Sequence, residues 1–422
     1  MKNILKSIIA FKLGFFARII IHRYRPRIVM VTGSVGKTST KDAIAEVLAR
    51  HFYIRKSEKS FNSEFGVPFT IFGVENPWGN PFAWFRVMKN ILALLVLPNH
   101  YPNMLVLEIG ADRPCDISRI LRFVTPDVVV VTRLPNIPVH VEAYSSPEAV
   151  REEEFSPAYA LRANTSLIIP ADDSYAIENA ASISSHIISY GIAQNATVRI
   201  SHFGFSEIEG KVIGMQATVH INGEQEKLLV TGSVGVTQLL PAAAAIAAAH
   251  AFNISLSKAL LALQDYEPPP GRGRLLSGKN NSTIIDDSYN SSPVAVEEAL
   301  ATLKAFPYAG RRIAILGDML ELGRYSVKEH ERIATIAADS ADMIVAVGIR
   351  ARAFTNVSKN VEVLAFCNSN DAALALPDIV REGDVILVKG SQSIRTERIV
   401  EALLANPSDI TKIVRQEKKW KQ

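Results

Sequence analysis

The stretch Val29-Met30-Val31-Thr32-Gly33-Ser34-Val35-Gly36-Lys37-Thr38-Ser39 decides the fold of the first large domain of this chain. It begins in an apolar run, passes through a turn with two glycines, and leads into a helical pattern over Lys41–Arg50. A strand, a glycine-containing loop and a helix in this order can bind phosphate, because backbone N–H groups and the helix N-terminus both face the phosphate oxygens. The stretch therefore predicts a nucleotide-binding α/β domain.

The residues of this loop have separate expected roles. Lys37 would reach the β- and γ-phosphates of a nucleotide, and the Thr38 hydroxyl would bind Mg²⁺. The spacing is unusual, because Val31 stands where the first glycine of the common motif would stand, and an ordinary glycine-rich turn is the alternative. The residues expected to bind the nucleotide are Gly33, Ser34, Val35, Gly36, Lys37, Thr38 and Ser39.

Length and composition indicate a globular protein of several domains. The chain has 422 residues, of which 48% are hydrophobic and 21% are charged, and two or three α/β domains are expected at this length. The formal net charge of +4 is small for this length and does not indicate a nucleic-acid partner. Cys115 and Cys367 are the only cysteines, so neither a disulfide framework nor a cysteine metal site is expected, and a cytoplasmic location is the default.

An apolar and basic segment, residues 1–26, precedes the phosphate loop. Its helical part, Ile4–Ile21, contains Lys6, Lys12 and Arg18, which point in different directions around a helix. Placing Lys12 near the middle of a bilayer would cost ~2.5–3.5 kcal/mol, and the same residue divides the apolar core that a signal peptide needs. Two interpretations of this segment stay open. It could be a helix that packs on the first domain, or it could anchor the protein on an anionic membrane surface.

A second apolar helix is expected over Trp84–Leu97, where only a narrow stripe is polar. Most helices of this kind lie in a core or an interface. A membrane-facing role shared with the first helix is the weaker alternative.

Alternating β runs and helical patterns indicate α/β domains with largely parallel sheets. After the phosphate loop the expected strands are Met104–Ile109, Asp127–Thr132 and Ser166–Ile169, and residues 197–231 read as a hairpin around an Asn-Gly turn. The Pro- and Gly-rich segment Tyr266–Arg274 is the clearest domain boundary, because prolines stiffen it and glycines allow a hinge.

We therefore expect a central domain over residues 27–268 and a C-terminal domain over 269–422. The second α/β block has no phosphate loop of its own, so it would act as a lid or bind a co-substrate. Its expected strands are Thr283–Asp287, Arg312–Leu316, Met343–Val347 and Asp384–Val388.

Polar residues at strand ends are further site candidates, because strand ends in open parallel sheets face the ligand crevice. Glu108 ends one apolar strand and could hold Mg²⁺ beside Thr38, and His140 follows another strand and could bind metal or phosphate. In the last block, Asn290 could read an adenine edge, and Asp318 could bind a ribose hydroxyl. Each residue also has an ordinary explanation as a turn, cap or surface group.

Together these segments resemble the Mur ligase family, the ATP-dependent amide ligases of cell-wall (peptidoglycan) precursor synthesis. The phosphate loop matches the Thr-Gly-x-x-Gly-Lys-Thr loop of that family, which accounts for its spacing. The other matching segments, in family order, are Asn62-Ser63-Glu64-Phe65-Gly66-Val67-Pro68, Glu108-Ile109-Gly110-Ala111, Asp286-Asp287-Ser288-Tyr289-Asn290, Leu316-Gly317-Asp318-Met319-Leu320-Glu321-Leu322-Gly323 and Val388-Lys389-Gly390-Ser391.

The resemblance implies a central P-loop ATPase domain with a mostly parallel sheet, followed by a Rossmann-like C-terminal domain. It also implies a reaction in which ATP and Mg²⁺ convert a carboxylate to an acyl phosphate, which an amine then attacks. Lys37 would bind the phosphates, and Thr38 and Glu108 would bind a first Mg²⁺. The remaining implied roles are a second Mg²⁺ at His140, phosphate or adenosine contacts from Arg272, and adenosine contacts from Asn290 and Asp318.

Three departures from the family pattern are visible. The UDP-binding domain with which the family usually opens is expected to be missing, because Arg27 almost directly precedes the phosphate loop. Glu154 stands where the family has a carbamylated lysine, fourteen residues after the histidine, so it either replaces that anionic group in catalysis or marks the loss of the second metal. A His-Asn pair of the family is replaced by Val234 and Gly235.

The function expected from this resemblance is the addition of a dipeptide such as D-Ala-D-Ala to a UDP-muramyl peptide, by a cytoplasmic monomer. Residues 4–21 would make peripheral contact with the inner face of the membrane. Two alternatives stay open, which are a nucleotide-binding descendant without catalysis and a ligase with a different amine or carboxylate substrate.

Overall fold

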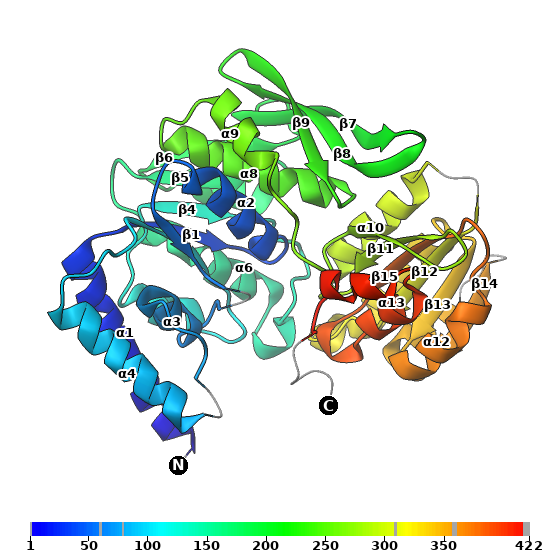
Figure 1. Cartoon of the computed structure of the whole chain (residues 1–422), viewed down its shortest axis with the longest axis horizontal. Helices are drawn as coiled ribbons and strands as arrows, with labels where there is room; N and C mark the ends of the chain where they lie inside the picture. Colours follow the sequence, from blue (N-terminus) through cyan, green and yellow to red (C-terminus); the bar gives the residue numbers. More distant parts are fainter. Residues whose placement is uncertain (1, 59–60, 78–79, 308–309, 357–360, 417–422) are drawn as a thin grey trace.

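The computed structural model shows two α/β domains joined by one connection (Figure 1). It describes residues 2–58, 61–77, 80–307, 310–356 and 361–416. Met1 and residues 417–422, which belong to the predicted segments 1–26 and 269–422, lie outside the described residues. The expected α/β fold with a mostly parallel sheet in each domain is confirmed.

The central domain is built on a nine-stranded sheet in the order β2-β3-β1-β4-β5-β6-β7-β8-β9. Strands β2 to β7 pair in parallel, whereas β7, β8 and β9 form an antiparallel meander. The strands are β1 (Arg27–Thr32), β2 (Ile54–Lys56), β3 (Met104–Glu108), β4 (Val128–Val131), β5 (Ser166–Pro170), β6 (His186–Gly191), β7 (Val198–Ile208), β8 (Lys211–Ile221) and β9 (Glu224–Thr231).

Helices cover both faces of this sheet, because the side chains of a buried strand alternate between its two faces. In β1, Val29 and Val31 pack into one core, and Ile28 and Met30 pack into the other. The helices of the first face are α2 (Lys37–Ala49), α8 (Val236–Ala251) and α9 (Leu256–Leu263). The helices of the second face are α1 (Lys2–Tyr24), α3 (Gly66–Phe72), α4 (Pro81–Val96), α5 (Asp116–Leu121), α6 (Pro147–Phe155) and α7 (Ser174–Ala180).

The antiparallel part contains one strand more than the sequence predicts. The expected Asn222-Gly223 turn joins β8 to β9, and both residues have positive φ, as a two-residue hairpin turn requires. A second hairpin joins β7 to β8 through Glu209 and Gly210. Much of β7 is only half-buried or exposed, so its sequence lacks the alternation that would mark a strand.

Both apolar N-terminal segments form helices that pack on the central domain. The helix predicted over Ile4–Ile21 is α1, and the one predicted over Trp84–Leu97 is α4. Tyr24 Oη donates a hydrogen bond of 2.8 Å to the Leu94 carbonyl, which ties the two helices together. Among the helices in the described part of the chain, none is both long and apolar enough to cross a bilayer.

The C-terminal domain has a six-stranded sheet in the order β10-β11-β15-β12-β13-β14. Only β10 runs antiparallel to its neighbour. The strands are β10 (Arg274–Ser277), β11 (Thr283–Asp287), β12 (Arg312–Gly317), β13 (Met343–Val347), β14 (Glu362–Phe366) and β15 (Val385–Lys389), and the α-helices are α10 (Pro293–Ala305), α11 (Ser326–Ala338), α12 (Ser369–Ala375) and α13 (Glu397–Leu403). The predicted domain boundary between residues 268 and 269 falls in the connection between α9 and β10.

Candidate active site

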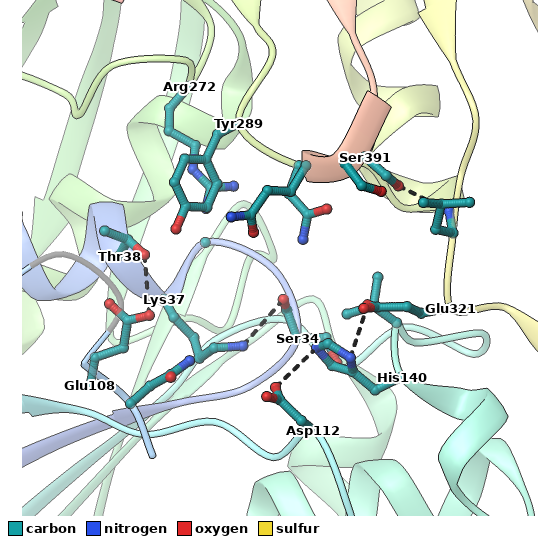
Figure 2. A pocket seen from close by; sticks show the side chains of 17 residues that line it. Ser34, Lys37, Thr38, Glu108, Asp112, His140, Arg272, Tyr289, Glu321 and Ser391 are labelled. Atoms are coloured by element: carbon teal, nitrogen blue, oxygen red, sulfur yellow. Dashed lines mark hydrogen bonds and ion pairs between the residues drawn. The ribbon is translucent and has the colours of Figure 1, made fainter. Parts of the chain in front are cut away.

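A cavity of about 470 Å³ lies between the two domains, at the C-terminal ends of β1 and β3 (Figure 2). The central domain contributes the phosphate loop and the segment after β4, and the C-terminal domain contributes the loops that follow β11, β12 and β15. Strand ends of both parallel sheets therefore meet at one place, which is the usual position of ligand sites in such folds.

The phosphate loop needs glycine at two positions. Gly33 and Gly36 have φ of 115° and 91°, and a Cβ on Gly33 would come within 2.4 Å of Thr132 Oγ1. Gly36 is the N-cap residue of α2, whose N-terminal N–H groups are available to an anion. Of the seven loop residues predicted to bind the nucleotide, four line the cavity, which are Ser34, Gly36, Lys37 and Thr38.

Lys37 extends along the loop and faces a buried carboxylate. Its ammonium group donates a hydrogen bond to the Gly33 carbonyl and lies 3.7 Å from Glu154 Oε1. The Ser34 hydroxyl donates to the other oxygen of Glu154. Glu154 is 1% exposed and does not line the cavity, and burial raises the pKa of its carboxyl group. The structure thus places Glu154 behind the loop, where it can act on the reaction through Lys37.

Thr38 and Glu108 meet at the floor of the cavity. The Thr38 hydroxyl donates a hydrogen bond of 3.2 Å to Glu108 Oε1. Glu108 Oε2 is buried without a hydrogen bond among the described residues, although Lys41 Nζ lies 3.8 Å away. Burial raises the pKa of this carboxyl group against the pull of Lys41 and Lys37.

A buried carboxylate oxygen that lacks a hydrogen bond and lies beside a hydroxyl fits a Mg²⁺ ion, which prefers oxygen ligands and keeps several waters and phosphate oxygens. Among the described residues no three His, Cys, Asp or Glu side chains cluster as a complete metal site. A Mg²⁺ ion at Thr38 and Glu108 would thus complete its shell with phosphate and water.

His140 connects the two domains. Its Nδ1 lies 2.9 Å from Glu321 Oε2 of the C-terminal domain, and its Nε2 lies 3.5 Å from Asp112 Oδ1 (Figure 2). Burial lowers the pKa of His140, but the hydrogen bond and the charge of Glu321 outweigh it, so the net pKa is raised. His140 and Glu321 both have a φ of 65°, which side chains other than glycine adopt only under local constraint.

The C-terminal domain places a cation and an aromatic ring over the cavity. The Arg272 guanidinium lies 4.2 Å from the centre of the Tyr289 ring, and Asn290 follows in the same loop. Buried Lys389 holds this loop, with Nζ 2.6 Å from Asp287 Oδ2 and 3.0 Å from the Asn290 carbonyl.

Asp318 is not brought to the cavity. Its carboxylate accepts a hydrogen bond of 2.7 Å from the Ala351 N–H, so it supports the turn after β13, and its predicted ribose contact stays a prediction. Other lining residues were not singled out from the sequence as site residues. They include Asn62, Asp112, Tyr289, Glu321 and Ser391. Four of these lie inside segments that carry the family resemblance, and that position was the available signal.

This geometry can bind a nucleoside triphosphate. Lys37 and the start of α2 face the place of the phosphates, and Glu108 and Thr38 offer oxygen atoms to a metal ion. Arg272 and Asn290 approach from the other domain. A cavity shared by two domains can also hold a second substrate against the terminal phosphate and exclude water when the domains close.

Comparison with known families covers most of the chain. Residues 31–249 match the model of the Mur ligase middle domain, and residues 271–392 match that of the Mur ligase glutamate ligase domain. A curated relative, the UDP-N-acetylmuramoyl-tripeptide–D-alanyl-D-alanine ligase of Bacillus subtilis, is 27% identical over 387 residues, which span 90% of this chain and 76% of the relative.

Solved structures share the fold. MurF from Acinetobacter baumannii aligns with a TM-score of 0.77 at 20% identity, over 95% of this chain and 80% of that one. The MurF ligase from Thermotoga maritima in complex with ADP aligns with a TM-score of 0.76 at 23% identity, over 93% and 83% of the two chains.

Proposed function

Because this chain belongs to the Mur ligase family, we propose that it is an ATP-dependent, ADP-forming ligase of the MurF type. Its proposed reaction joins a dipeptide such as D-Ala-D-Ala to a UDP-muramyl peptide, which is the activity that the relatives of this chain are named for. The observation that carries this proposal is that Lys37, Glu108 and Arg272 line one shared cavity, to which both domains contribute.

The reaction has two steps. A carboxylate oxygen of the muramyl peptide attacks the γ-phosphorus of ATP, the bond to the β-phosphate oxygen breaks, and ADP leaves. The dipeptide amine, having lost a proton, then attacks the acyl carbon, and the tetrahedral intermediate expels inorganic phosphate to leave an amide. Transfers of this kind depend mainly on positioning and on neutralising charge.

The side chains divide this work between them. Lys37 would bind the β- and γ-phosphates, and Arg272 would approach the phosphate or adenosine from the C-terminal domain. Asn290, held by Lys389, would contact the adenosine. Thr38 and Glu108 would hold a Mg²⁺ ion, which when bound neutralises charge on the phosphate oxygens.

His140 and Glu154 act in this proposal by positioning. The His140–Glu321 pair holds the C-terminal domain over the phosphate loop, and Glu154 holds Ser34 and the Lys37 ammonium group. The second Mg²⁺ expected at His140 and a direct catalytic contact of Glu154 stay predictions.

We place this activity in the cytoplasm, in a monomer with no nucleic-acid partner. Contact of residues 4–21 with the inner face of the membrane stays a separate prediction, which the ligation reaction does not require.

The direct test is ligation with purified protein, ATP, Mg²⁺ and a panel of UDP-muramyl peptides and amines. ADP release that depends on both substrates, with the amide product detected by mass spectrometry, is the expected result. Turnover with another amine or carboxylate only would change the substrate and keep the reaction class. Tight ATP binding without turnover across the panel would favour a non-catalytic descendant.

A further inference from the structure

The sides of α1 and α4 that face away from the core both carry exposed apolar side chains. Both helices contribute to the same core, and they lie on the flank of the central domain remote from the C-terminal domain (Figure 1). We call these two sides together the outer face. Its large apolar side chains, between 37% and 82% exposed, are Ile8, Phe11, Phe15 and Ile19 of α1 and Phe82, Phe85, Met88, Leu92 and Val96 of α4.

Each helix is apolar on two opposite sides. In α1 the buried side includes Leu13, Ala17 and Ile20, whereas the exposed apolar residues follow at intervals of three or four on the opposite side. A helix with apolar side chains on two opposite sides exposes one of them unless something covers it, and a large exposed apolar surface marks a contact with a protein or a membrane. The core covers only the inner side.

The charged side chains of the two helices themselves are all basic, and a carboxylate beside α4, that of Glu75, lines a pocket with Arg86 and Lys89. Residues 2–24 contain five lysines and arginines, residues 81–96 contain two, and neither helix contains Asp or Glu. Lys12 and Arg18 flank the exposed stripe of α1.

A groove of about 770 Å³ continues from the C-terminal half of this helix. Its only carboxylate among the described residues, Asp127, accepts a hydrogen bond from the Ile28 N–H. None of the groove's exposed basic side chains has an ion pair with a carboxylate in the part of the chain that the structure describes. They are Arg18, His22, Arg25, Arg27, Arg122 and Arg162.

We propose that the outer face docks on an anionic bilayer, with α1 and α4 in the interfacial plane and the basic groove against lipid phosphates. Aromatic and aliphatic side chains surrounded by lysine and arginine are typical of helices that lie in a membrane interface. A second copy of the chain fits less well, because a symmetric contact would bring two surfaces of the same charge together. The choice of the cytoplasmic side of the membrane rests on the proposed function. The docking itself is argued from the exposed apolar and basic side chains.

Co-sedimentation of the full chain with vesicles tests the apolar part. Wild-type protein is expected to bind vesicles of phosphatidylglycerol and phosphatidylcholine, and not vesicles of phosphatidylcholine alone. The double variant Phe11→Ser/Phe85→Ser should lower the partition coefficient at least tenfold, because each change removes an exposed ring that would enter the interface. The matched control, Val327→Ser/Leu374→Ser, changes two residues that are 70% and 79% exposed in the C-terminal domain, and should bind as the wild type does.

The basic part has its own variants. The triple variant Arg18→Gln/Arg122→Gln/Arg162→Gln should lower vesicle binding by about two orders of magnitude, since each basic residue near an anionic surface contributes about fivefold. The control Lys211→Gln/Lys227→Gln/Lys258→Gln removes the same charge elsewhere and should change binding by less than about threefold. Binding of the wild type should also weaken as salt rises.

Ligation of soluble substrates separates this proposal from the proposed function. All variants above are expected to retain that activity, and thermal unfolding checks that they fold. Two results would overturn the docking proposal and leave the proposed function intact. In the first, the wild-type enzyme is active but does not bind anionic vesicles. In the second, the Phe11/Phe85 variant loses self-association and keeps vesicle binding. Vesicle binding by an inactive wild type would overturn the function and leave the docking in place.

Discussion

Replacing Glu154 by glutamine tests how the buried carboxylate behind the phosphate loop acts. The change keeps the size of the side chain and its contact with Ser34, and it removes the negative charge 3.7 Å from Lys37 Nζ. If Glu154 acts only through Lys37, it competes with the nucleotide for the ammonium group. We therefore expect Glu154→Gln to bind ATP more tightly than the wild type.

The size of this effect follows from the distance and the exposure. Two unit charges at about 4 Å interact by about 4 kcal/mol at an effective dielectric constant of 20. The Lys37 side chain is 14% exposed and keeps its hydrogen bond to the Gly33 carbonyl, so most of this energy is screened or compensated. We expect a net gain of about 1 kcal/mol, which is about fivefold in the ATP dissociation constant.

Titration calorimetry with a non-hydrolysable ATP analogue, and steady-state ADP release under saturating substrates, measure the two quantities separately. Turnover should change by less than about tenfold, because Glu154 does not line the cavity. The matched control is Glu152→Gln, an exposed carboxylate on the same helix, which should change neither quantity. A turnover loss of more than about a hundredfold with unchanged ATP affinity would refute this reasoning and show that Glu154 acts on the reacting groups directly.

Three further outcomes are expected. Lys37→Ala should lower ATP turnover by about a thousandfold, because no other described cation lies on the phosphate loop, and wild-type ligation by that variant would contradict the site. Glu108→Gln should raise the Mg²⁺ concentration for half-maximal ADP release at least tenfold, since the variant loses the negative charge of a buried carboxylate whose Oε2 has no hydrogen bond among the described residues, and an unchanged Mg²⁺ titration would count against the metal position. Asp286→Asn concerns stability: burial raises the pKa of Asp286 to about 6 from 3.8, so the folded protein keeps a proton that the unfolded chain releases between these values. The free energy of unfolding of the wild type should therefore fall as pH rises through that window. The difference in this free energy between variant and wild type should be larger at pH 8 than at pH 4 by up to about 3 kcal/mol, and the difference in Tm should be larger at pH 8 as well. Equal Tm differences at the two pH values would contradict it.

The sequence alone determined the phosphate loop, because its structure depends on neighbours in the chain. Gly33 and Gly36 adopt the positive φ angles that only glycine takes easily, and Lys37 and Thr38 follow on the first turn of the helix. The Asn222-Gly223 turn was predictable for the same reason. Buried parallel strands were also predictable, since they are continuous apolar runs in the sequence.

Only the tertiary structure decided which distant residues meet. In the sequence Glu154 is one of three consecutive glutamates on a helix, and its burial behind Ser34 depends on how α6 packs beneath the loop. The pairing of His140 with Glu321 depends on how the two domains sit together.

The same limit applies to α1. Its apolar sequence predicts a helix and leaves its environment open, because burial in a core and burial in a membrane interface favour the same side chains. Packing against α3 and α4 uses the side with Leu13 and Ala17, and it leaves the side with Phe11 and Phe15 exposed. The sequence sets local conformation through neighbouring residues, whereas burial and charge pairing are set by contacts between residues far apart in the chain.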